Sequence, residues 1–161
     1  MRSGIAALVA AAALAGCAAG CSVGGSSGWA HRSEHTCADA NKTITKLKAP
    51  GDPKAALAYA LDRYVAVEHA VSELTDSTLP GGAVGRDLRT LWLAPARASL
   101  EAADADLRRL RTAVRAGDRT GASVAFGAAT AAGTSGVDTA VLRTQGLSAC
   151  AALFTPAPHS L

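Results

Sequence analysis

Aromatic residues are scarce in this chain: two Trp, two Tyr and two Phe make up 4% of 161 residues. Ile is also rare, so the side chains that favour strands are too few for a β-sandwich or a β-barrel. Hydrophobic residues nevertheless form 49% of the chain, and most of them are Ala, Leu and Val. Because Ala is the strongest helix former, the composition predicts an all-α fold.

Charge of one sign is not concentrated anywhere along the chain. The 16 Lys and Arg residues are interspersed with 13 Asp and Glu residues, for a net charge of +3. Without a basic stripe, no nucleic-acid partner is expected. The glycine-rich C-terminal part lacks a Gly-Lys-Ser/Thr element, which excludes a phosphate-binding loop. No catalytic triad, pair of catalytic carboxylates or third ligand to a His pair stands at suitable spacing, so we expect no enzyme, metal or other cofactor.

The chain has no long hydrophobic run, and its longest apolar stretch is only about ten residues. Residues 5–14 are apolar and follow the positive Arg2. Ten residues are too few to span a bilayer but match the central region of an export signal. Residues 1–16 are therefore predicted to be a signal peptide.

The end of this run carries a recognisable motif. Leu14-Ala15-Gly16-Cys17 resembles the lipobox of bacterial lipoproteins. The resemblance implies a diacylglycerol on Cys17, cleavage just before it, and attachment to the extracytoplasmic face of the cell membrane. A second, weaker match ends at Cys21, so lipidation there stays open as an alternative.

The remaining chain divides into three parts. Residues 17–33 are rich in Gly and Ser and predict a lipidated, flexible tether spanning about 20 Å. Residues 34–154 predict one helical domain, and residues 155–161 a disordered tail. The domain is long enough for a single hydrophobic core.

Four helical stretches are expected in the domain. The first covers residues 34–49, and Asp52-Pro53 then starts the second with an N-cap carboxylate and a proline in the first turn. The second runs to about Asp76, with apolar residues every three or four positions. These are Leu57, Ala60, Tyr64, Val67, Val71 and Leu74. The third extends from near Arg86 to Gly117 and should be kinked or divided at Pro95.

The fourth stretch begins at Asp118 and is interrupted by glycines. A break is expected between Gly133 and Gly136, followed by a final turn over residues 147–154. Its contact face should contain four apolar residues. These are Val124, Ala128, Ala131 and Leu142.

This pattern predicts an up-down-up-down four-helix bundle with a kinked third helix. In such a bundle the start of the first helix lies beside the end of the fourth, where Cys37 and Cys150 stand. Because export leads to an oxidising compartment, these two cysteines are expected to form a disulfide that closes the bundle.

A looser resemblance covers roughly residues 36–154. Cys37-x-x-x-Asn41, Ala116-Gly117-Asp118 and Gly146-Leu147-x-x-Cys150 make the layout similar to uncharacterised helical lipoproteins of high-GC Gram-positive bacteria. The resemblance implies a disulfide-closed bundle and no particular activity.

Two functional hypotheses follow. The first is a membrane-tethered, non-enzymatic interaction or scaffold module that presents a helix face to a protein partner in the cell envelope. The alternative is a small-ligand or metal-binding envelope protein, with a pocket near the Pro95 kink lined by Trp92, Tyr59 or Tyr64.

The chain has one dense group of potential metal ligands. It consists of His31, Glu34, His35 and Cys37, and the two histidines would share a face only if the first helix reached back to His31. With Cys37 assigned to the disulfide, solvated histidines are the expected outcome.

Overall fold

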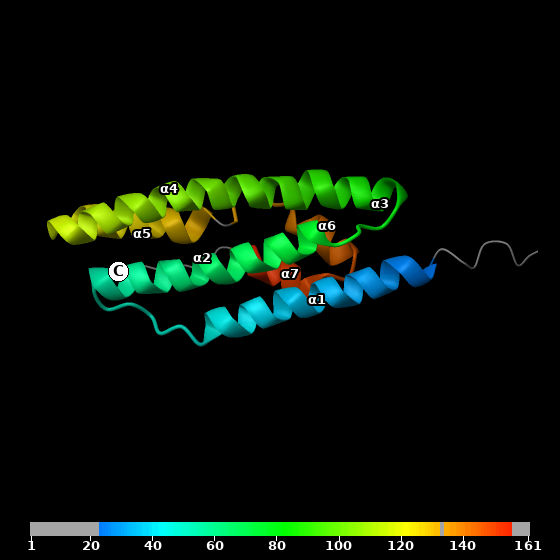
Figure 1. Cartoon of the computed structure of the whole chain (residues 1–161), viewed down its shortest axis with the longest axis horizontal. Helices are drawn as coiled ribbons and strands as arrows, with labels where there is room; N and C mark the ends of the chain where they lie inside the picture. Colours follow the sequence, from blue (N-terminus) through cyan, green and yellow to red (C-terminus); the bar gives the residue numbers. More distant parts are fainter. Residues whose placement is uncertain (1–22, 133, 156–161) are drawn as a thin grey trace, which may run out of the picture.

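The computed structural model describes residues 23–132 and 134–155, and every regular element in these ranges is helical (Figure 1). The all-α prediction is confirmed. The predicted signal peptide, Cys17, Cys21 and the tail from residue 156 onward lie outside the described residues.

Three long helical rods lie side by side and run in alternating directions (Figure 1). They are α1 (Val23–Thr45), α2 (Pro53–Asp76) and a continuous third rod made of α3 (Gly82–Asp87), η1 (Leu88–Leu93) and α4 (Ala94–Ala116). Three shorter helices complete the described part of the chain: α5 (Arg119–Ala132), α6 (Thr139–Thr144) and α7 (Ser148–Leu153).

Helix α1 begins earlier than expected, at Val23 instead of residue 34, and ends at Thr45 instead of residue 49. Residues 23–33 are therefore helical, and the flexible tether predicted to reach Ser33 was too long. The reason is Trp29, which is 2% exposed and packs edge-to-face on Trp92 with ring centroids 6.3 Å apart. Its Nε1 donates a hydrogen bond to Ser77 Oγ. Tertiary burial of this side chain overrides the poor helix propensity of the surrounding Gly and Ser residues.

Helix α2 has the boundaries that the sequence predicts. The Asp52 carboxylate accepts hydrogen bonds from the backbone N–H groups of Lys54 and Ala55, and Pro53 occupies the first helical position. These bonds satisfy donors that lack a partner within the helix.

The third rod changes its hydrogen-bonding pattern just before Pro95. Here η1 is a π-helix, and the Ala94 N–H donates to Arg89 O, five residues back. Pro95 has no N–H to donate to Leu91 O, and the Asp138 N–H donates to that carbonyl instead, at 3.0 Å. Pro95 was expected to kink or divide the third helix. The rod is not divided there but contains a π-helical stretch just before Pro95, and it begins at Gly82, earlier than the expected Arg86.

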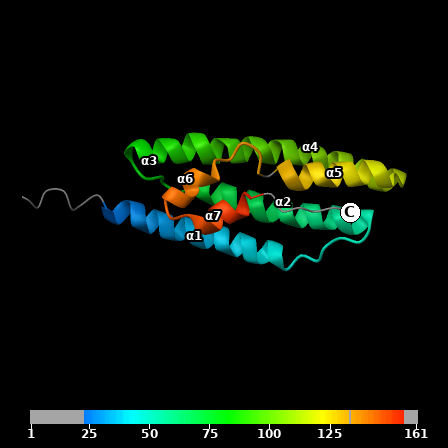
Figure 2. The ribbon, with the colours of Figure 1, turned by 180° about the vertical axis from the view of Figure 1, so that it is seen from behind.

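The fourth stretch is divided into α5, α6 and α7, and one continuous fourth rod is not observed. The predicted break between Gly133 and Gly136 and the predicted final turn are both confirmed. Helix α5 packs on α4, α6 packs on η1, and α7 packs on α1; Figure 2 shows α6 and α7 between α1 and the third rod.

The predicted contact face of α5 was partly wrong. Val124 is 71% exposed and Ala131 is also exposed, whereas Phe126 is fully buried. The inward face instead contains Ala122, Ala125 and Phe126, because a start at Arg119 and packing against both α4 and α2 set its rotation.

The buried side chains form two clusters along the length of the rods. One surrounds Trp29, Trp92 and Phe154 and includes the two bonded cysteines. The other surrounds Tyr59 and Phe126 beneath α5. The rods α2 and α4 contribute to both clusters and so connect them.

Candidate functional site

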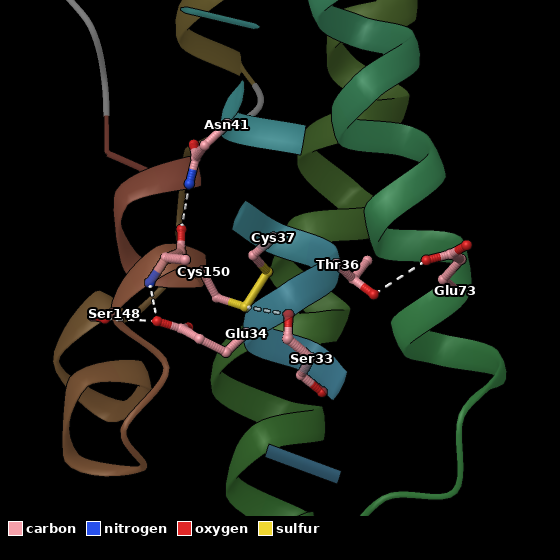
Figure 3. Close-up of a disulfide and its surroundings, with 9 residues drawn as sticks. Ser33, Glu34, Thr36, Cys37, Asn41, Glu73, Ser148 and Cys150 are labelled. Atoms are coloured by element: carbon pink, nitrogen blue, oxygen red, sulfur yellow. Dashed lines mark hydrogen bonds between the residues drawn. A yellow bond between two sulfur atoms is a disulfide. The ribbon is translucent and has the colours of Figure 1, made fainter. Parts of the chain in front are cut away.

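A disulfide joins Cys37 in the middle of α1 to Cys150 in α7, as the sequence predicted (Figure 3). Both cysteines are fully buried. The bond lies at mid-helix and not at a bundle end, because α1 extends further toward the N-terminus and α7 folds back along α1.

Two polar side chains of α1 hold the first turn of α7 beside this disulfide. Glu34 Oε1 accepts hydrogen bonds from Ser148 Oγ at 2.6 Å and from the Ala149 N–H at 2.7 Å. Asn41 Nδ2 donates to the Ala149 carbonyl at 2.7 Å. Glu34 therefore caps α7 from another helix, since Leu147 at the N-cap has no side chain able to do so. This cluster has a structural role.

The three aromatic residues proposed for a pocket near Pro95 are not brought together around one cavity. Trp92 is buried in the first core cluster, between Trp29 and Phe154, whereas Tyr59 belongs to the second cluster. Tyr64 is half-buried and contacts both clusters. Trp92 and Tyr59 therefore fill the interior, whereas Tyr64 lines a cavity of about 380 Å³ together with Arg97 and Leu100 of α4.

A separate cavity of about 400 Å³ does lie next to the π-helix. It is lined by Leu93 and Ala94, by Arg89 and Arg97, and by the end of α2. The hydroxyl of Ser77 in this wall is already used, accepting from Trp29 and donating to the Leu74 carbonyl.

The possible metal ligands of α1 are engaged in other ways. The early start of α1 does place His31 and His35 on one face, with ring centroids 4.8 Å apart. However, Glu34 caps α7 and Cys37 is in the disulfide. Within residues 23–132 and 134–155, no group of three or more His, Cys, Asp or Glu side chains is arranged to hold a metal ion.

The feature that the sequence did not indicate is an open groove between α1 and α2, of about 660 Å³. Two of its lining residues, Thr36 and Glu73, face each other on the α2 side of α1, away from the side that is bonded to α7 (Figure 3). The floor of the groove consists largely of small side chains, including Ala40 and Ala70, which are buried, and Ala66, which is half-buried.

Carboxylates and histidines border this groove. Asp39, Asp62 and Glu73 line it together with His35 and His69, and no Lys or Arg does. With neutral histidines its formal charge is −3, opposite to the +3 of the whole chain.

The groove carboxylates differ in their partners. Glu73 accepts a hydrogen bond from Thr36 Oγ1 at 3.2 Å, and its Oε1 lies 3.3 Å from His69 Nε2. In the described part of the chain, neither Asp39 nor Asp62 pairs with a cationic side chain. Their charge is therefore free to act on a molecule that enters the groove.

Two titratable groups elsewhere on α2 respond to their surroundings. Burial lowers the pKa of Arg63, with Tyr59 acting in the opposite direction. Burial also raises the pKa of Tyr64, and the neighbouring Asp104 and Glu68 raise it further while Arg108 lowers it. Neither group lines the groove.

Charged residues on α4 pair with each other along the helix. Arg108 pairs with Asp104 one turn away, and Arg109 pairs with Asp106. Such exposed pairs contribute little to stability.

No protein-family model, curated protein or solved structure matches this chain. Among the helices of the described residues, none has both the length and the apolar character needed to cross a membrane.

Proposed function

We propose that this protein is a lipid-anchored, non-enzymatic interaction module of the bacterial cell envelope, attached through Cys17 and docking a protein partner in the groove between α1 and α2. The observation that carries the docking role is the groove itself: an open, acid-bordered channel with a floor of small side chains. Its length and openness suit a segment of another protein.

The position at which α1 begins supports a short connection between the lipid on Cys17 and the helical domain. Val23, the first residue of α1, is the sixth residue after Cys17. Six residues span at most about 20 Å when fully extended. A lipid on Cys17 would therefore hold the domain close to the membrane surface, with the N-terminal end of α1 nearest to it.

The attachment is tested by mass spectrometry of the full-length protein extracted from bacterial membranes, together with fractionation of two variants. We expect diacylglycerol on Cys17, release of Cys17→Ser from the membrane fraction, and retention of Cys21→Ser. Lipid on Cys21, or membrane retention of Cys17→Ser, would overturn the assignment to Cys17.

The docking role is tested separately in living cells with a photo-crosslinking residue at Val65, which borders the groove, and at Val124 on α5. We expect one discrete protein adduct from position 65. The absence of any adduct at either position would argue against an interaction module.

A second candidate function is binding of a small ligand near Pro95, because the cavity of about 400 Å³ borders Leu93 and Ala94 at the end of the π-helix. A rise in melting temperature with a small molecule, abolished by Ala94→Trp, would favour it over docking.

We also propose that the domain is best regarded as a modified up-down-up-down bundle. The alternating directions of the three long rods support this view, with α5, α6 and α7 together taking the place of the fourth helix.

A further inference from the structure

The groove between α1 and α2 follows one face of α2. On α2 its lining recurs at Asp62, Val65, His69 and Glu73, at intervals of three or four residues. The stretch from Asp62 to Glu73 covers about 17 Å of helix, which is the length of a three-turn segment. An entering helix would therefore meet lining residues along each of its turns.

The floor of the groove permits close approach of another backbone. Ala40 on α1 and Ala66 and Ala70 on α2 project only methyl groups. Small residues between two neighbouring helices leave a hollow into which the ridge of a third helix fits, and helices with small contact residues pack at the short end of the interaxial range of about 8 to 10 Å.

One large apolar side chain at the groove is left without cover. Val65 is 59% exposed and borders the groove directly. A valine at the edge of a hollow lined with alanines provides an apolar contact for a helix that carries Leu or Val on one face.

The negative charge at the groove favours positive residues on the polar face of an entering helix. Asp39 projects from α1 and Asp62 and Glu73 from α2, so carboxylates border the groove from both helices. Lys or Arg side chains that flank the apolar stripe of an entering helix would meet these carboxylates on either side.

From these features we infer that the groove binds a basic amphipathic helix of a partner protein, with its apolar face on Val65 and the alanine floor and its Lys or Arg residues beside Asp39, Asp62 and Glu73. This inference rests on the proposed docking function and names the chemistry of the partner.

A comparison within the molecule supports the choice of this groove. A second open groove, of about 700 Å³, lies between α4 and α5 and borders the exposed Val124. It is lined by two Asp and two Arg residues, and Arg109 is paired with Asp106. Its charge is balanced, so it offers no comparable attraction for a cationic helix.

The probe is a synthetic peptide of about 12 to 14 residues, with Leu and Ala on one helical face and Lys on the other, matched to the groove length. Its binding to the full-length lipidated protein in zwitterionic nanodiscs is measured by fluorescence anisotropy, with empty nanodiscs as the blank. A peptide of identical composition but scrambled order keeps the charge and removes the apolar face.

Four variants of the protein test the assignment. We expect Asp62→Asn to weaken binding of the amphipathic peptide by about two- to fivefold, as an exposed charge pair would. Val65→Lys, which adds a like charge and removes the apolar contact, should weaken it by about tenfold or more. The matched controls Glu101→Gln and Val124→Lys change an exposed acid and an exposed valine outside the groove, and should bind as the wild type does.

Equal binding of the ordered and scrambled peptides would overturn the inference, as would equal effects of Val65→Lys and Val124→Lys. Dimerisation of the wild type that competes with the peptide and is lost in Val65→Lys would overturn it in favour of a second copy of this chain. If a cellular cross-link forms through position 124 and the peptide fails to bind, the docking function survives and the groove assignment does not.

Discussion

Arg63 brings a positive charge into the inner face of α2, where the residue is 7% exposed. Among the residues that the structure describes, no carboxylate forms an ion pair with it. The guanidinium remains protonated despite its lowered pKa. Removing this charge from water therefore lowers the stability of the folded state.

Replacing Arg63 by Met should therefore stabilise the protein, by on the order of 1 kcal/mol, because Met retains the long apolar stem and removes the charge. Urea unfolding of the full chain measures the change, with the exposed Arg97→Met as a control of unchanged stability. If Arg63→Met instead lowers the free energy of unfolding by about 1 kcal/mol or more, the guanidinium must make a stabilising contact with an anion in the folded protein.

The raised pKa of the Tyr64 hydroxyl makes the stability of the fold depend on pH in the alkaline range. Burial, together with Asp104 and Glu68, raises the pKa of its hydroxyl above the usual value of 10.0. Below that value the hydroxyl is protonated in both the folded and the unfolded chain. As pH rises further, the unfolded chain loses the proton first, and the folded state loses stability through the raised pKa.

The Tyr64→Phe variant lacks this titration, so its unfolding midpoint should fall less than that of the wild type between pH 9 and about 11. Tyrosinate absorbance, taken as the difference between wild type and variant, measures the pKa directly. A difference titration centred at or below the usual tyrosine value would contradict the expected direction.

At the scale of single elements, α1 depends on one residue. The segment around Trp29 is rich in Gly and Ser and would not form a stable helix alone. The buried indole, its contact with Trp92 and its hydrogen bond to Ser77 attach this segment to the third rod and to the end of α2.

Trp29→Ala should lower the free energy of unfolding by about 3 to 5 kcal/mol, the usual range for deletion of a buried aromatic side chain. Amide hydrogen exchange should also accelerate over residues 23–33 more than over the rest of α1, which the disulfide holds to α7. Val84→Ala, at an exposed apolar position, is the control. Unchanged exchange over residues 23–33 would show that the helix does not depend on Trp29.

The third rod shows how one proline affects two distant segments. Pro95 removes a donor from the rod, and the carbonyl of Leu91, four residues earlier, accepts a hydrogen bond from the Asp138 N–H. Asp138 also caps α6 through its side chain, which accepts from the Ala140 and Val141 N–H groups. The disturbance at Pro95 thus positions the start of α6 on η1.

At the scale of the whole molecule, the disulfide connects residues that are 113 positions apart. The bond closes nearly the entire described domain into one loop, from the middle of α1 to α7. It therefore restricts the unfolded chain strongly, while Glu34 and Asn41 hold the same two helices together in the folded state.

The double variant Cys37→Ser, Cys150→Ser should lose about 4 to 5 kcal/mol of stability, as expected for closure of a loop of this length. Guanidinium unfolding of the full chain with and without a thiol reductant measures it. Reductant should lower the midpoint of the wild type and leave that of the double variant unchanged. An equal response of both proteins would contradict a stabilising role for this bond.

Local signals in the sequence determined several features of this protein. Asp52-Pro53 starts α2 and Gly117 ends α4, with a left-handed φ of 70° that glycine adopts without strain. The apolar spacing of α2, the break after α5 and the Cys37–Cys150 pairing were also predicted, because caps, periodicity and export chemistry depend on near neighbours or on a few residues.

Only the tertiary structure decided the rest. The start of α1 depends on a contact between Trp29 and Trp92, which are distant in sequence, and the rotation of α5 depends on the surfaces of α2 and α4. The groove likewise exists because two helix faces, each unremarkable alone, lie next to each other with their alanines inward and their carboxylates at the border. Helix propensity acts within a segment, whereas burial is decided by the partner against which that segment packs.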